Sequence, residues 1–268
     1  MVISHAGGRI VTVDPADGGR WTSLQLAGRE WLWAGPGLVT GSRSCLATFI
    51  DGGGVDECFP TVRGTPDHGG LWNQPWDGTV EYGGAVLNRA FTAGTDTLTV
   101  DYHLEAAPGY QFIWAAHALL ECVAGAVISA PPGTECRLYP EAAKGLPWAW
   151  PADAPWVASA WPTPLDLSTY GPSDGTAAGA ILVDCPTVSV RDRGAELTMT
   201  LSCPGQPVST ALWRNQGGFP TEAPYRSLGV EPMLGRVFDL ASAGPDDAAV
   251  MPASGELTWR LTLSAKPV

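Results

Sequence analysis

The chain has 268 residues, a formal net charge of −12 and a near-neutral mean hydropathy of +0.03. Apolar residues make up 45 %, enough for a large core, whereas charged residues make up only 16 %, below the roughly 25 % of an average domain. The acidic balance argues against binding to nucleic acid or to an anionic membrane surface, because both need clustered Lys and Arg. Twelve Trp residues exclude a disordered chain.

Alternating apolar and polar residues predict antiparallel β-strands along most of the chain. In chain order we expect strands at 10–13, 22–26, 30–34, 85–91, 97–105, 111–117, 125–129, 180–183, 187–191, 196–201, 210–214, 227–230 and 256–263. The clearest is 97–105, whose Leu98, Val100, Tyr102 and Leu104 share one face. Gly-containing turns separate the strands, and there is no amphipathic helix of three turns. The pattern predicts an all-β, large antiparallel sandwich or barrel, with residues 1–268 in a single domain.

Two long segments lack this alternation. Residues 51–76 are rich in Gly, Pro, His and Trp, and residues 141–164 hold four Trp and five Pro. Loops of this length in a compact domain are usually functional. No signal peptide is recognisable, and no stretch approaches the about 20 apolar residues of a membrane helix, so we expect a cytoplasmic protein.

Two histidines and several carboxylates are candidates for chemistry. His68 lies in a Gly-rich loop that would present its imidazole, so functional and structural roles are equally open. His117 shares a strand face with Ile113 and Ala115, which is more typical of a hydrogen-bonded core histidine. Glu231 follows strand 227–230, where Pro232 is expected to end the ladder, and by itself the pattern fits a solvated carboxylate. Asp56 and Glu57 form another candidate pair.

Aromatic residues in the expected loops suggest a sugar ligand. Flat aromatic faces pack against the C–H faces of sugars, and an acidic protein does not oppose a neutral ligand. Six Trp residues lie in such loops: Trp72, Trp76, Trp148, Trp150, Trp156 and Trp161. No nucleotide-binding glycine motif or hydrolase motif occurs, so no cofactor is expected. His68, His117 and Glu231 could instead form a two-histidine, one-carboxylate metal set, but nothing in their spacing favours a metal over acid–base use.

Two stretches of the chain resemble the aldose 1-epimerases, the galactose mutarotase-like proteins. The first runs from Gly52 to Trp76 and contains Cys58-Phe59-Pro60 and Pro66-Asp67-His68-Gly69; it is most similar to the hexose-6-phosphate-epimerase-like branch. The second contains Trp213-Arg214-Asn215 and Leu228-Gly229-Val230-Glu231-Pro232. Together they span roughly residues 52–263, with the order His, His, Glu found in the family.

The resemblance implies a large β-sandwich of the galactose mutarotase type and an isomerase that interconverts the α and β anomers of a sugar. Glu231 would take the proton of the anomeric hydroxyl, His117 would protonate the ring oxygen, and His68 would bind the same region. Further sugar-binding candidates are Arg63, which lies near but not at the place where the family has an arginine, and Asp67, Trp72, Trp76, Trp213 and Asn215. A sugar is the expected partner. The alternative is a non-catalytic carbohydrate-binding sandwich on the same scaffold.

Overall fold

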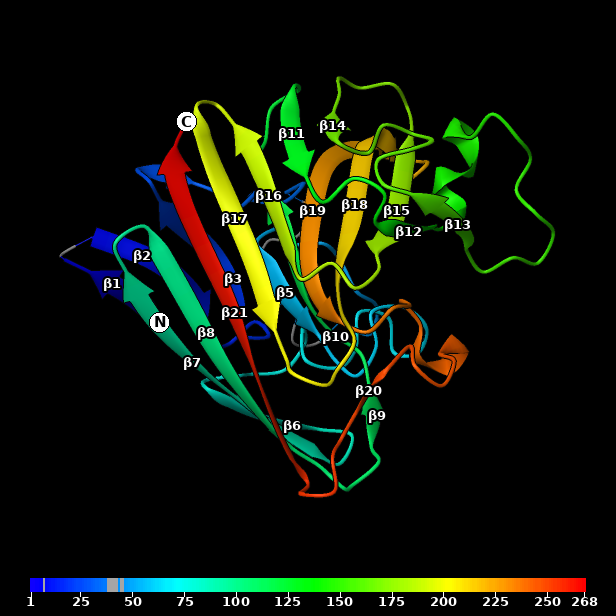
Figure 1. The fold of residues 1–268 in the computed structure, drawn as a ribbon. Helices are drawn as coiled ribbons and strands as arrows, with labels where there is room; N and C mark the ends of the chain where they lie inside the picture. The colour runs from blue at the N-terminus through cyan, green and yellow to red at the C-terminus, as the bar shows by residue number, and fades with distance from the viewer. Residues whose placement is uncertain (7, 38–42, 44–45) are drawn as a thin grey trace.

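The computed structural model describes residues 1–6, 8–37, 43 and 46–268. Two large sheets face each other, and every strand pair within them is antiparallel (Figure 1). The predicted all-β sandwich is therefore confirmed. The described residues contain two short 3₁₀ helices, η1 (Pro140–Gly145) and η2 (Leu240–Ser242). No helix among them is long and apolar enough to cross a membrane.

The larger sheet has eleven strands and carries the candidate site. Its strands, in spatial order, are β1 (Val2–His5), β2 (Gly8–Asp14), β3 (Arg20–Leu26), β5 (Val55–Cys58), β10 (Trp114–Leu120), β19 (Tyr225–Leu234), β18 (Val208–Phe219), β15 (Ala177–Leu182), β12 (Glu135–Leu138) and β13 (Val157–Ala160), with β4 (Arg29–Glu30) paired to β3.

The smaller sheet has eight strands and covers one face of the larger sheet. Its strands, in spatial order, are β14 (Thr169–Tyr170), β11 (Ala126–Ser129), β16 (Thr187–Asp192), β17 (Ala195–Ser202), β21 (Glu256–Pro267), β8 (Thr97–Glu105), β7 (Ala85–Gly94) and β6 (Thr79–Tyr82). A separate pair joins β9 (Gln111–Phe112) to β20 (Ala249–Val250). Leu98, Val100, Tyr102 and Leu104 of β8 are all buried, as the alternation predicted.

Several strands were not predicted, among them β5, whose sequence does not alternate. All four residues of β5 are buried, because one face meets the core and the other meets the covering loops, so its sequence lacks a polar side. The expected strand 30–34 is reduced to β4, which ends at Glu30. The expectation that Pro232 ends its strand is wrong: β19 continues to Leu234, and Pro232 pairs with Thr210 of β18. The missing N–H of proline is tolerated because the ladder to β10 is interrupted there.

The main core lies between the two sheets. Trp114, Ala116 and Ala118 of β10 belong to the same cluster as Leu98 and Val100 of β8. Ile113 and Ala115 belong to a second cluster, with Val237 and Phe238, on the other side of β10. The predicted division of this strand into two faces is thus confirmed, and His117 lies on the face turned away from the smaller sheet.

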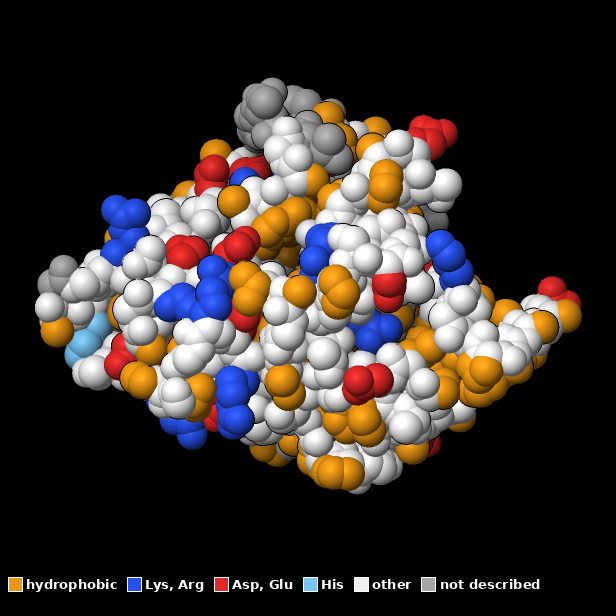
Figure 2. All heavy atoms as spheres, turned by 90° about the horizontal axis from the view of Figure 1, so that it is seen from above, with side chains coloured by type: hydrophobic (Ala, Val, Ile, Leu, Met, Phe, Trp, Pro, Cys, Tyr) orange, Lys and Arg blue, Asp and Glu red, His pale blue; other side chains and the backbone are white. Residues whose placement is uncertain are grey.

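The surface seen in Figure 2 is chemically mixed. Basic side chains are scattered among acidic and uncharged ones on this face, and apolar side chains extend along a projecting arm at one side. In Figure 1 the connection between η1 and β13 projects from the edge of the larger sheet. Trp148 in this connection is 47 % exposed. The expectation that nucleic acid is not a partner stays a prediction.

Candidate active site

Strand register brings His117 and Glu231 together. Ala115 pairs with Met233 and Leu119 with Gly229 in the β10–β19 ladder, which places His117 directly opposite Glu231. Opposed residues on antiparallel strands point to the same face of the sheet. His117 Nε2 lies 3.7 Å from Glu231 Oε1. Two residues far apart in the sequence therefore lie side by side on the outer face of the larger sheet.

Glu231 is a buried carboxylate with a space kept free for it. The residue is 3 % exposed, and burial raises the pKa of its carboxyl group, while His117 and Arg63 act in the opposite direction. Gly229 lies two residues earlier on the same face, where a Cβ atom would lie 2.4 Å from Glu231 Oε1. Glycine at this position thus makes room for the carboxylate beside Trp213.

His68 reaches the same place from the loop after β5. Its φ of +57° is unusual for a residue with a side chain, and such strain is common at functional sites. The ring stacks on Phe49 with centroids 3.6 Å apart, and lies 5.1 Å from the ring of His117. Asp67 Oδ1 lies 3.1 Å from His68 Nδ1. Burial lowers the pKa of His68 although Asp67 acts to raise it, so the neutral imidazole is favoured at neutral pH.

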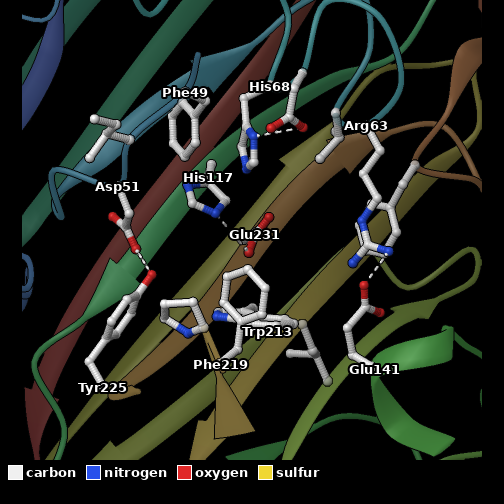
Figure 3. A pocket seen from close by; sticks show the side chains of 16 residues that line it. Phe49, Asp51, Arg63, His68, His117, Glu141, Trp213, Phe219, Tyr225 and Glu231 are labelled. Atoms are coloured by element: carbon white, nitrogen blue, oxygen red, sulfur yellow. Dashed lines mark hydrogen bonds and ion pairs between the residues drawn. The ribbon is translucent and has the colours of Figure 1, made fainter. Parts of the chain in front are cut away.

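These groups line a cavity of about 450 Å³, within the range of ~300–1,000 Å³ typical of small-molecule sites. Figure 3 shows His117 and Glu231 at its centre, between two polar pairs. On one side Tyr225 donates a hydrogen bond to Asp51 Oδ2 at 3.1 Å. On the other, Arg63 forms an ion pair with Glu141 at 2.9 Å. Aromatic walls complete the cavity: Phe49, Trp213, Phe219, Tyr225 and Phe238.

The structure brings together six of the nine residues to which the resemblance gives a catalytic or sugar-binding role: His68, His117, Glu231, Arg63, Asp67 and Trp213 all line this cavity. Their roles in catalysis and binding stay predictions. The cavity lining also includes residues that the sequence reasoning missed: Phe49, Asp51, Glu141, Phe219, Tyr225 and Phe238. Two of these could have been found from the sequence. Asp51 directly precedes Gly52, where the resemblance begins, and Glu141 is the first residue of the Trp-rich connection.

Three predicted sugar-binding residues lie outside the cavity. Trp76 is fully buried, with the Arg89 guanidinium 3.7 Å from its ring centroid. Trp72 is 3 % exposed and packs edge-on against Phe49. Asn215 is also buried; its side chain accepts hydrogen bonds from the backbone N–H groups of residues 217–219 and donates one to the Phe219 carbonyl. Its place in the site is indirect, because it shapes the end of β18 that presents Phe219.

The candidate pair Asp56 and Glu57 is divided between the two faces of β5. Asp56 accepts two hydrogen bonds from Arg43, at 2.8 and 2.6 Å, and Arg43 also binds Asp17. Glu57 points into the main core, where it pairs with Arg89. Both carboxylates are buried and neutralised by arginine, which is the signature of structural ion pairs rather than of acid–base groups.

No ligand set for a metal is present among the described residues. None of their His, Cys, Asp and Glu side chains form a group of three or more suited to an ion. His68, His117 and Glu231 are close together but do not form such a group. The metal alternative drawn from the sequence is therefore not supported.

No protein-family model matches the chain, and no curated protein matches its sequence. Solved structures do match its fold. A candidate aldose 1-epimerase from Escherichia coli K12 is 14 % identical, with a TM-score of 0.67 and coverage of 100 % of this chain and 98 % of that one. A galactose mutarotase-like protein from Lactobacillus casei is 12 % identical, with a TM-score of 0.56 and coverage of 99 % of both chains.

A galactose mutarotase related enzyme from Lactobacillus acidophilus is 13 % identical, with a TM-score of 0.59 and coverage of 99 % of this chain and 97 % of that one. These matches extend over the whole chain, so the architecture is that of the galactose mutarotase-like sandwiches. At such low identity the likeness concerns the fold. The chemistry has to be argued from the cavity itself.

Proposed function

We propose that this protein is an aldose 1-epimerase, an isomerase that interconverts the α and β anomers of a sugar. The observation that carries the proposal is the pairing of Glu231 and His117 across 3.7 Å on the floor of an aromatic-lined cavity. Ring opening requires one group to remove the anomeric proton and another to protonate the ring oxygen. Since both oxygens are bonded to the same carbon, adjacent side chains can serve them together.

In the proposed mechanism Glu231 accepts the proton of the anomeric hydroxyl while His117 donates a proton to the ring oxygen. The bond between the anomeric carbon and the ring oxygen breaks, and an open-chain aldehyde forms. Rotation about the bond next to the aldehyde carbon exposes its other face to the ring hydroxyl. Ring closure returns each proton by the reverse path, so acid and base are regenerated.

His68 is proposed to bind the sugar rather than to transfer its proton. The Asp67 carboxylate faces Nδ1 at 3.1 Å and favours a proton on that atom. In the neutral imidazole, Nε2 then carries a lone pair that can accept a hydrogen bond from a sugar hydroxyl. The ring of Phe49 stacks on the imidazole of His68 and holds it in place.

The test is anomer exchange followed by saturation-transfer NMR on a panel of free aldoses, comparing the wild type with Glu231→Gln. The variant removes the base with little change of shape, so we expect exchange to slow by ~10²–10⁴-fold while sugar binding persists. Glu135→Gln, on the exposed side of β12, is a matched control that should retain activity. Full activity in Glu231→Gln would show that Glu231 is not the base. Binding without exchange for every sugar would favour a carbohydrate-binding protein.

A further inference from the structure

The connection at 141–164 contributes one side chain to the cavity, Glu141. It lies in the first turn of η1, whose start is set by Pro140. Its Oε1 lies 2.9 Å from Arg63 Nη1, and the two side chains form one side wall of the cavity (Figure 3). Neither the ring-opening step nor the contact of His68 with the sugar uses this pair. Its function therefore needs a separate explanation.

Arg63 is held from several directions. Its guanidinium lies 4.6 Å from the ring centroid of Phe238 and 5.2 Å from that of Tyr139, in addition to the ion pair with Glu141. The Arg63 side chain is 32 % exposed and that of Glu141 28 %, so water screens the pair only in part. Arg63 is thus fixed with its charge already compensated, rather than extended toward the cavity as a free cation.

Arg63 compensates the negative charge of Glu141. Its Oε2 atom is buried and has no hydrogen-bond partner. The atom lies over Gly179 of β15, where a Cβ atom would be 3.3 Å from Oε2 and 2.9 Å from Arg63 Nη2. If a ligand took Arg63 away, the carboxylate would lose its partner in a site where one oxygen already has none, which is costly.

The charge of the whole cavity also disfavours a negatively charged ligand. Its lining holds four carboxylates, Asp51, Asp67, Glu141 and Glu231. Among the described lining residues Arg63 is the only Lys or Arg. Asp67 is ionised at neutral pH, since His68 and Arg63 help lower the pKa of its carboxyl group. A phosphate or carboxylate on the ligand would meet an excess of negative charge in a partly desolvated cavity.

We infer that the sugar of this site is uncharged, and that Glu141 enforces this selectivity by occupying Arg63, the cation that a phosphorylated sugar would need. This inference rests on the proposed function, because it specifies the substrate class of the same cavity. Arg63 and Glu141 are then specificity-determining residues that reject anionic sugars. The Trp-rich connection takes part in recognition through its first turn.

The test is a comparison of binding, which does not depend on catalysis. Glucose and galactose, and the 6-phosphate of each, are titrated into the wild type by isothermal calorimetry. We expect the 6-phosphates to bind at least ~10-fold more weakly than the free sugars, a difference of ~1.4 kcal/mol. Equal or tighter binding of the 6-phosphates would overturn the inference, as would the absence of binding by every one of these sugars.

Variants then show whether Glu141 is responsible. Glu141→Gln keeps the shape but frees the charge of Arg63, so the preference for the free sugar should fall ~10-fold, because a charge-assisted contact to phosphate becomes possible. Adding Arg63→Met to this variant should restore the preference. Glu135→Gln, which removes the carboxylate of an ion pair with Arg137 outside the cavity, should leave it unchanged.

The result separates selectivity from a merely structural role. If the pair only braced η1, Glu141→Gln would weaken both forms of the sugar alike and leave their ratio unchanged, which would overturn the inference. The anomer-exchange experiment is independent of this outcome. A protein that binds free sugars selectively but never exchanges their anomers would refute the proposed enzyme and keep the inferred selectivity.

Discussion

The buried pair of Glu57 and Arg89 supports the strand that carries His117, and its removal should be costly. The two side chains are 0 % and 1 % exposed. Glu57 also accepts hydrogen bonds from Tyr102 Oη and Trp114 Nε1, both at 3.2 Å. Arg89 donates to the Gly19 carbonyl at 2.5 Å. Because Trp114 is the first residue of β10, this cluster links the core to the sheet that holds the site.

Replacing one member of the pair leaves the other as an uncompensated charge in the core. Breaking a buried ion pair from one side costs about 3–5 kcal/mol, and we expect this loss for Arg89→Met. In the double variant Arg89→Met, Glu57→Gln, no buried charge remains, and the glutamine oxygen can still accept from Tyr102 and Trp114. Its loss in the free energy of unfolding should therefore be smaller than that of Arg89→Met alone.

The assay is urea unfolding followed by Trp fluorescence, with a double-mutant cycle completed by Glu57→Gln. Arg260→Met serves as the control, because Arg260 pairs with Asp101 on the exposed side of β21 and β8, with side chains 61 % and 45 % exposed. Its unfolding midpoint should not change. Should the losses of the two single variants add in the double variant to within ~0.5 kcal/mol, the ion-pair reasoning would be refuted.

Two further predictions concern Glu231. Because burial raises the pKa of this carboxyl group, its charge costs stability above the ordinary Glu pKa, so Glu231→Gln should raise the urea midpoint at neutral pH. The gain should vanish near pH ~3, more than a unit below the ordinary Glu pKa of about 4.3, where the carboxyl group is protonated in both folded and unfolded states; a gain that does not depend on pH would contradict this. Gly229→Ala places a Cβ atom 2.4 Å from Glu231 Oε1 and should slow anomer exchange by about 100-fold through misplacement of the base. Unchanged exchange rates in this variant would show that the gap at Gly229 does not position Glu231.

Local alternation predicted the longer strands that have one polar and one apolar face, whereas short ones such as β6 and β12 were not predicted. The predicted strand 97–105 matches β8 residue for residue, and the two faces of β10 were assigned correctly before any strand partner was known. This works because the side-chain period of a strand is a property of the backbone alone. It failed for β5, where both faces are covered and the alternation disappears.

The motif resemblance located three residues of the cavity that local patterns alone would have left as structural or undecided. His117 by itself fitted a core histidine, and Glu231 a carboxylate at the end of a strand. The same reasoning also selected Trp72 and Trp76 as sugar-binding residues, but both lie outside the cavity. Composition and loop position cannot distinguish a tryptophan that faces a ligand from one that fills the core, because the two differ only in what covers the ring.

The sequence by itself determined the class of fold, the spacing of its strands and the side on which His117 would lie. Only the tertiary structure decided that Glu231 stands opposite His117, that Glu141 occupies Arg63, and that Phe49 and Tyr225 close the cavity. Periodicity acts over neighbouring residues. The register between β10 and β19 and the approach of the two long loops depend on contacts between segments far apart in the chain, which no local pattern encodes.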